Sequence, residues 1–139
     1  MVNQNKIRSK IQTINDNLAK LNVIKSKNID EFLESPFLSD AAIRLLQVSI
    51  EAMLDISHHL VSRELLGTPK SYRETIEMLA LAGILPKEKL PTFINMVKFR
   101  NRAVHIYDKI SDEEIYQTIE CNLSDFDDFI KSIIQFLSK

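Results

Sequence analysis

The sequence predicts an all-α fold, an up-and-down bundle of four main helices with one additional short helix. Apolar residues recur at spacings of three and four along most of the chain, and no segment alternates apolar and polar residues as a strand does. Only 2 Gly and 4 Pro occur among 139 residues, which favours long uninterrupted helices. The length is that of one ordinary domain, so we expect residues 1–139 to form a single unit.

The clearest periodicity predicts a first helix from about residue 4 to residue 27. Its apolar stripe consists of Ile7, Ile11, Ile14, Leu18 and Leu21. The polar and acidic stretch 28–36 predicts a short linker after this helix. We expect Phe32, Leu33 and Phe37 to pack that linker onto the bundle.

A second long helix is predicted from Asp40, as its N-cap, to about Leu65. Its buried stripe consists of Ile43, Leu46, Ile50, Met53, Leu54, Leu60 and Val61. Gly67, Thr68 and Pro69 end this helix, because glycine and proline interrupt helical backbone.

Two capping boxes predict the starts of later helices. Ser71 and Glu74 open a short third helix, and Ser111 and Glu114 open the last one. A fourth helix is predicted to start at about Glu88. The residues expected to face inward on these three helices are Ile76, Leu79, Ala80, Leu90, Phe93, Ile94, Val97, Ile115, Ile119, Phe126, Phe129, Ile130, Ile133 and Leu137.

Charge and cysteine content exclude several classes of protein. Lys plus Arg number 18 and Asp plus Glu number 19, so there is no chain-wide attraction to nucleic acid or anionic membranes. The single cysteine, Cys121, cannot form an internal disulfide and favours a reducing compartment. The longest apolar run, Met78 to Leu85, is too short to cross a bilayer, and the first ten residues lack a secretory signal. We therefore expect a cytoplasmic protein without membrane contact.

One basic cluster lies between residues 98 and 109, where only Asp108 opposes five basic side chains. These are Lys98, Arg100, Arg102, His105 and Lys109. Arginine offers a planar fork of donors to phosphate, and histidine exchanges a proton near neutral pH. The cluster therefore suits phosphate binding. The alternative is a solvated helix end whose cations offset the helix dipole.

The cluster resembles the R-x(4)-H-x-Y signature of HepT-like proteins in the HEPN superfamily, with Arg100, His105 and Tyr107 at the three positions. Asn101 is the polar residue that commonly follows the motif arginine. Beyond the motif, the resemblance extends over residues 45–56 and over Pro69, Ser71, Tyr72 and Arg73. It thus covers essentially the whole chain and implies a HEPN-like fold.

The resemblance implies a metal-independent endoribonuclease toxin, in which the ribose 2′-hydroxyl attacks the adjacent phosphate. His105 then acts as general acid or base, and Arg100 stabilises the negative charge of the transition state. We expect Lys98, Asn101 and Arg102 to bind RNA. Two proton transfers are needed and each motif holds one histidine, so we expect a two-fold homodimer with a composite cleft.

The same resemblance implies a type VII toxin-antitoxin pair, whose minimal nucleotidyltransferase antitoxin attaches adenylate to Tyr107. If the helix continued that far, Tyr107 would share a face with Arg100, seven residues earlier. An adenylate there would repel RNA phosphates. Two alternatives stay open: an ordinary half-buried tyrosine, and a non-catalytic helical dimer that binds a nucleotidyltransferase or a nucleotide.

One face of the second predicted helix carries four polar residues: Glu51, Asp55, His58 and Ser62. Asp55 and His58 have the acid-x-x-His spacing of metal sites in helical bundles, but the second such pair that those sites require is missing from the sequence. We therefore predict neither a metal nor a cofactor. The face is interpreted as solvated, or as bordering the cleft, where Glu51 or Asp55 would orient Arg100 or Arg102.

Overall fold

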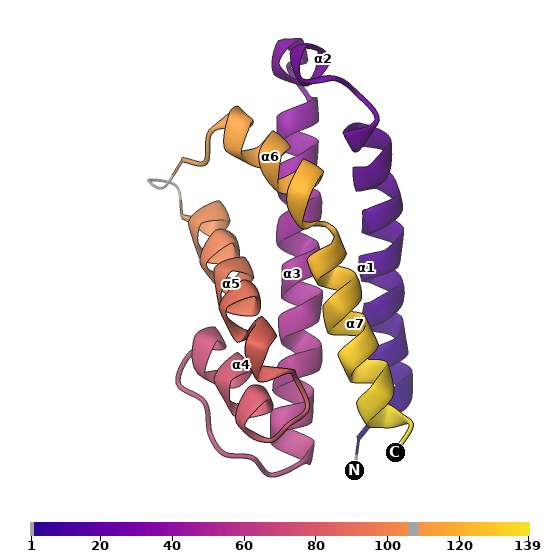
Figure 1. Cartoon of the computed structure of the whole chain (residues 1–139), viewed down its shortest axis with the longest axis vertical. Helices are drawn as coiled ribbons and strands as arrows, with labels where there is room; N and C mark the ends of the chain where they lie inside the picture. Colours follow the sequence, from indigo (N-terminus) through magenta and orange to yellow (C-terminus); the bar gives the residue numbers. More distant parts are fainter. Residues whose placement is uncertain (1, 106–108) are drawn as a thin grey trace.

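The computed structural model describes residues 2–105 and 109–139, and over these residues all regular secondary structure is helical (Figure 1). The prediction of an all-α fold is confirmed. The described elements are α1 (Gln4–Lys25), α2 (Ile29–Glu34), α3 (Leu38–Arg63), α4 (Tyr72–Leu81), the 3-10 turn η1 (Lys87–Lys89), α5 (Leu90–Val104), α6 (Asp112–Asn122) and α7 (Ser124–Leu137).

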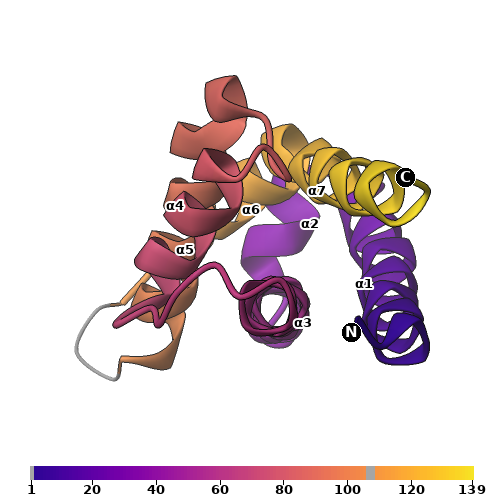
Figure 2. The same ribbon diagram turned by 90° about the horizontal axis from the view of Figure 1, so that it is seen from below.

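The long helices run alternately up and down the bundle. α1 rises, α3 descends, α5 rises again, and α6 with α7 forms the descending fourth column (Figure 1). Seen from the end, α1 flanks α3 on one side and α4 with α5 flanks it on the other (Figure 2). α4 is the predicted short helix. No helix in the described parts of the chain combines the length and hydropathy that crossing a bilayer requires.

The core lies where the apolar stripes of these helices meet. In α1 the predicted stripe is confirmed, because Ile7, Ile14 and Leu21 are completely buried. α5 and α7 meet through Phe93 and Phe129, whose ring centroids lie 5.8 Å apart in an edge-to-face arrangement. This packing fixes the position of α5, the helix that carries the motif arginine.

The predicted linker between the first two long helices contains a helix of its own, α2. The side chain of Asn28 caps it by accepting a hydrogen bond from the backbone N–H of Glu31 at 2.8 Å. Phe32 is fully buried, and its ring centroid lies 5.2 Å from that of Tyr116 on α6. The expectation that Leu33 and Phe37 pack onto the bundle is wrong, because these side chains are 36% and 75% exposed.

The start of α3 also differs from the prediction. The helix begins at Leu38, and Asp40 lies in its first turn instead of acting as the N-cap. The backbone N–H groups of Phe37 and Leu38 both donate to the Ser35 hydroxyl at 3.1 Å. Ser35 therefore satisfies the helix start, and the carboxylate of Asp40 only complements the helix dipole.

The last predicted helix is divided into α6 and α7 at Leu123. The Asn122 side-chain amide donates to the carboxylate of Asp125 at 3.2 Å, and the N–H of Phe126 bonds to the carbonyl of Leu123, three residues back. Short polar side chains of this kind compete with the helical ladder through local hydrogen bonds. The apolar stripe continues in α7, where Phe126, Phe129, Ile130 and Ile133 are buried.

Both serine caps predicted from the capping boxes are present. The hydroxyls of Ser71 and Ser111 accept hydrogen bonds from the N–H groups of Glu74 and Glu114, each at 3.1 Å.

We expect Ser111→Ala to lower the free energy of unfolding by about 1 kcal/mol, because α6 loses this cap. Urea denaturation followed by circular dichroism measures the change. Ser111→Asp, which retains an acceptor, should stay near wild type, and equal losses in both variants would contradict the capping role.

Candidate functional site

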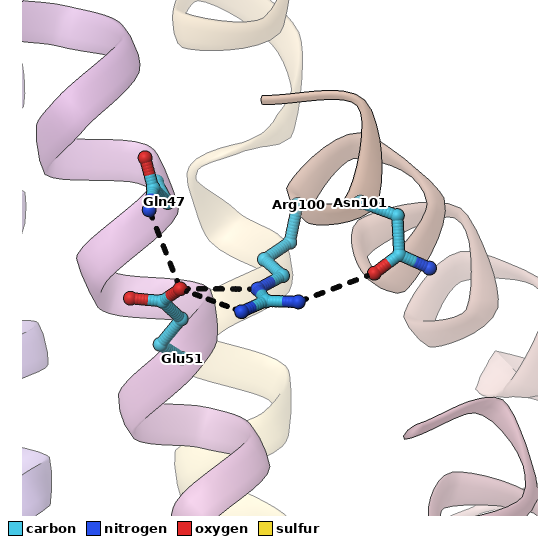
Figure 3. Close-up of polar contacts among 4 residues, drawn as sticks. All are labelled: Gln47, Glu51, Arg100 and Asn101. Atoms are coloured by element: carbon cyan, nitrogen blue, oxygen red, sulfur yellow. Dashed lines mark hydrogen bonds and ion pairs between the residues drawn. The ribbon is translucent and has the colours of Figure 1, made fainter. Parts of the chain in front are cut away.

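Arg100 lies in the last turns of α5, and its side chain points to a carboxylate on α3. Its Nε and Nη2 groups both donate to Oε2 of Glu51 at 3.0 Å (Figure 3). The side-chain amide of Gln47, one turn before Glu51 on α3, donates to the same oxygen at 3.3 Å. Gln47 therefore orients the Glu51 carboxylate on α3, and that carboxylate in turn binds the guanidinium of Arg100.

Two further contacts fix the plane of the Arg100 guanidinium. Its Cζ atom lies 5.0 Å from the ring centroid of Tyr72, the first residue of α4, at cation-π distance. Its Nη1 group donates to Oδ1 of Asn101 at 3.4 Å. The Arg100 side chain is only 19% exposed, so residues from α3, α4 and α5 set its orientation.

The hydrogen-bond inventory of Arg100 shows what remains for a ligand. A guanidinium carries five N–H donors, of which two are on Nη1 and two on Nη2. Among the described residues Glu51 takes two donors and Asn101 takes one, so one N–H on each terminal nitrogen is left. A pair of donors on adjacent nitrogens matches the spacing of two phosphate oxygens.

Arg102 lies two residues further along α5, about 200° around the helix from Arg100. Its Nη1 and Nη2 groups donate to the two carboxylate oxygens of Glu114 on α6, at 2.6 and 3.1 Å. With the exposed Lys98, Arg102 lines a pocket of about 360 Å³ between α3, α5, α6 and α7. The fork of Arg102 is thus directed at Glu114, on the opposite side of α5 from Arg100.

His105 is the C-cap of α5, with extended backbone and an exposed side chain. Its backbone N–H donates to the carbonyl of Arg102 at 3.2 Å. His105 lines a recess together with Arg102, Lys109 and two residues at the start of α3, Ser39 and Asp40. The imidazole of His105 is therefore accessible to solvent.

The motif residues are therefore distributed around the end of α5. Arg100 contacts α3 and α4, whereas His105 lines the recess with Arg102 and Lys109. α5 ends at Val104, and His105 is its C-cap. Tyr107 itself lies outside the described residues.

The polar face of α3 is divided between two partners. Glu51 binds Arg100, whereas Asp55 forms an ion pair with Lys10 of α1 at 2.9 Å. His58 is exposed on the same face. Across the described ranges, no group of three or more His, Cys, Asp or Glu side chains is arranged to hold a metal ion.

Three contacts of this site did not follow from the motif. In the sequence, Tyr72 stands out only as part of a segment that resembles the family, and its position against Arg100 depends on how α4 packs. Gln47 lies one turn from Glu51, a spacing that would have placed both on one face. The sequence predicts Glu114 only as part of a capping box, and in the structure Glu114 also binds Arg102.

Comparison with known proteins places this chain in a family. Residues 14–133 match the family described as Ribonuclease HepT-like. The chain is 29% identical over 127 residues to the mRNA nuclease HepT of Shewanella oneidensis, covering 91% of this chain and 95% of that protein. It is 28% identical over 133 residues to the tRNA nuclease HepT of Aphanizomenon flos-aquae, covering 94% of this chain and 89% of that protein.

A solved structure agrees with these similarities. The tri-AMPylated HEPN toxin of Shewanella oneidensis, in complex with MNT antitoxin, superposes with a TM-score of 0.86 at 28% identity, covering 94% of this chain and 97% of that one. The HEPN-like fold expected from the motif is thus confirmed. Because the family match spans most of the chain, the protein belongs to the Ribonuclease HepT-like family.

Proposed function

We propose that this protein is a metal-independent endoribonuclease toxin that cuts RNA by attack of a ribose 2′-hydroxyl on the adjacent phosphate. Arg100 and His105 are its catalytic residues. The observation that carries the proposal is an arginine fixed by Glu51 at the end of a helix whose C-cap is an exposed histidine. This arrangement occurs in a chain of a ribonuclease family.

Arg100 binds the scissile phosphate through the two donors that its protein contacts leave over. As the 2′-oxygen attacks, negative charge grows on the phosphate oxygens, and a fixed guanidinium stabilises that charge without having to reorganise. Glu51 is a positioning residue in this scheme, because it orients the guanidinium and keeps the Nη1 and Nη2 edge toward the substrate.

His105 moves the protons. One imidazole removes the proton of the 2′-hydroxyl, the P–O5′ bond breaks, and a second proton reaches the leaving 5′-oxygen. One chain supplies one motif histidine, so His105 and the partner subunit's His105 perform the two transfers across a homodimer cleft. Pairing of one protomer's Arg100 with the other's His105 also accounts for their different neighbours within a chain.

The remaining basic and polar residues near the end of α5 contact the RNA backbone. Lys98 and Asn101 are exposed and have donors for phosphate oxygens. Arg102 adds positive charge beside the recess of His105, but Glu114 offsets it. We therefore assign a smaller share of the affinity for RNA to Arg102 than to Lys98.

The test of the nuclease proposal is cleavage of RNA by the purified protein in the presence of EDTA. A 5′-labelled RNA should yield fragments that end in a 2′,3′-cyclic phosphate. A requirement for added Mg²⁺ would contradict the mechanism. RNA that is bound but left intact would instead favour the non-catalytic dimer, in which the same bundle docks a nucleotidyltransferase or a nucleotide.

A nucleotidyltransferase antitoxin is proposed as the partner that inactivates the toxin by attaching AMP to Tyr107. Similar proteins support this, since the Shewanella oneidensis HEPN toxin is AMPylated and bound to MNT antitoxin. Tyr107 follows the proposed catalytic His105 by two residues in the sequence. A phosphate on its hydroxyl would add negative charge close to where RNA must bind.

Tyr107→Phe should abolish this modification. After co-expression with a cognate nucleotidyltransferase, mass spectrometry should show the mass of AMP on the peptide that contains Tyr107 in the wild type. The same peptide should be unmodified in Tyr107→Phe, because the accepting hydroxyl is missing. Tyr116→Phe is the matched control and should retain the adduct. AMP located on a different residue would contradict the assignment.

A further inference from the structure

A second basic recess lies between the start of α1 and the end of α3. Its polar lining consists of Lys6, Lys10, Asp55, His58, His59, Ser62 and Arg63, and Tyr72 borders it. With a volume of about 530 Å³, it lies within the size range of pockets that hold small ligands, roughly 300–1,000 Å³. Neither Arg100 nor His105 lines this recess.

The charge of this recess departs from that of the chain. Lys6, Lys10 and Arg63 carry three positive charges against one negative charge on Asp55, whereas the whole chain has a formal charge of -1. Lys10 is paired with Asp55 at 2.9 Å. Within the described residues, Lys6 and Arg63 have no ion-pair partner.

Helix electrostatics accounts for only part of this cluster. Arg63 lies in the last turn of α3, where a cation complements the helix dipole. Lys6 lies in the first turn of α1 and Lys10 in a following turn, close to the end where the dipole disfavours cations. The first turn of α1 contains no acidic residue that would offset this cost. An anionic ligand would offset it.

His59 fixes the geometry of the recess. Its Nε2 atom accepts a hydrogen bond from the backbone N–H of Asn3 at 2.9 Å, and the Asn3 side chain caps α1 by accepting from the N–H of Lys6 at 3.1 Å. Burial, and then the positive charges of Lys6 and Arg63, lower the pKa of His59 below its usual value. Through these hydrogen bonds the ring ties the turn that carries Lys6 to α3.

Tyr72 connects this recess to the candidate catalytic arginine. Its side chain lines the recess, and the centroid of its ring lies 5.0 Å from Cζ of Arg100. A polyanion bound at Arg100 can therefore pass over Tyr72 into the group of Lys6, Lys10 and Arg63. Single-stranded RNA has this form, with one phosphate on each nucleotide and bases that can contact an exposed aromatic ring.

We propose that this recess is a binding site for the backbone of single-stranded RNA, which holds a phosphate a few nucleotides away from the one cleaved at Arg100. Lys6 and Arg63 are the main residues that bind the phosphate. Lys10 adds positive charge that its ion pair with Asp55 offsets only in part. The proposal rests on the nuclease function proposed above. It assigns α1 and α3 a part in substrate affinity and none in the chemical step.

The test compares RNA binding by the double variant Lys6→Glu/Arg63→Glu with binding by Lys20→Glu/Lys131→Glu. The second variant makes the same change of charge at exposed positions of α1 and α7 outside the recess. The probe is a fluorescently labelled single-stranded RNA oligonucleotide. Binding is followed by anisotropy in the His105→Ala background, which prevents cleavage during the measurement.

Reversing both recess charges should raise the Kd at least about tenfold and lower the slope of log K against log salt by about 1 to 2. In the cleaving protein, KM should rise while kcat at saturating RNA stays near wild type. In the control variant, Kd and KM should each change by less than about twofold, because screened surface charges act weakly at a distance. Lys6→Ala and Arg63→Ala give the same test if the double variant does not fold.

The outcomes separate this inference from the nuclease proposal. If the wild type cleaves RNA and the recess variant binds RNA like the control, the recess assignment is overturned and the nuclease stands. If the wild type neither binds nor cleaves RNA, both fail. If the variant keeps its affinity for RNA but loses the nucleotidyltransferase antitoxin, the recess is a docking surface for an acidic protein and the RNA assignment is wrong.

Discussion

His105→Ala should lower the rate of RNA cleavage by about 10²- to 10⁴-fold, the range typical for the loss of a general acid or base. The folded state should persist, because the His105 side chain is exposed and its structural contact is a backbone hydrogen bond to the carbonyl of Arg102. Alanine retains that N–H. Single-turnover cleavage of labelled RNA measures the rate, and circular dichroism with thermal denaturation measures the fold.

Chemical rescue tests whether the missing group is a proton carrier. Because His105 is exposed in its recess, added imidazole should reach the vacated position and restore part of the rate of His105→Ala. Gln117→Ala, an exposed change on α6, is the control and should cleave like the wild type. Light scattering should report a dimer for all three proteins. A fully active monomer would contradict the composite cleft. Unimpaired cleavage by His105→Ala would show that this residue takes no part in the chemistry.

Much of the helical bundle follows from spacing alone. The stripe of α1 and the serine caps at Ser71 and Ser111 are local patterns, and each lies where the sequence predicts it. α2 was not predicted, because six residues are too few to show a helical period. Its start depends on the Asn28 cap and on burial of Phe32 against α6, a contact distant in sequence.

The site was predictable to a different extent. The motif indicated Arg100 and His105, and the period of α3 placed Glu51 and Asp55 on one face. Which of the two carboxylates meets Arg100 depends on how α1 and α5 are positioned against α3. Lys10 of α1 takes Asp55, so Glu51 is the carboxylate that meets α5. Such positions result from packing of whole helices and leave no local pattern in the sequence.

Arg100→Ala should lower kcat/KM for RNA cleavage by about 10²- to 10³-fold, because a fixed donor to the transition-state phosphate is lost. Arg100→Lys should recover little of this activity. An ammonium group is a point charge, and it lacks the planar fork that binds Glu51 on one edge and leaves donors for phosphate on another. Steady-state kinetics with one defined RNA substrate measures both variants.

Glu51→Ala should lower kcat by about tenfold to a hundredfold, although this carboxylate does not touch the substrate, because a small displacement of a positioned group has effects of this size. The guanidinium of Arg100 then keeps the Tyr72 ring and Asn101 but loses two hydrogen bonds. Glu51→Gln should lower kcat less, because the amide oxygen of glutamine carries no charge but still accepts a hydrogen bond from Arg100.

A double-mutant cycle decides whether Glu51 acts through Arg100. In the Arg100→Ala background, Glu51→Ala should change kcat by less than about twofold, because residues in direct contact are not additive when one acts through the other. If the losses of the two single variants multiply in the double variant, Glu51 has a role separate from that of Arg100. With Arg100 intact, a gain in activity for Glu51→Ala would show that the carboxylate competes with phosphate for the guanidinium. The sign of the change in that single variant therefore distinguishes a carboxylate that prepares the arginine for catalysis from one that inhibits it.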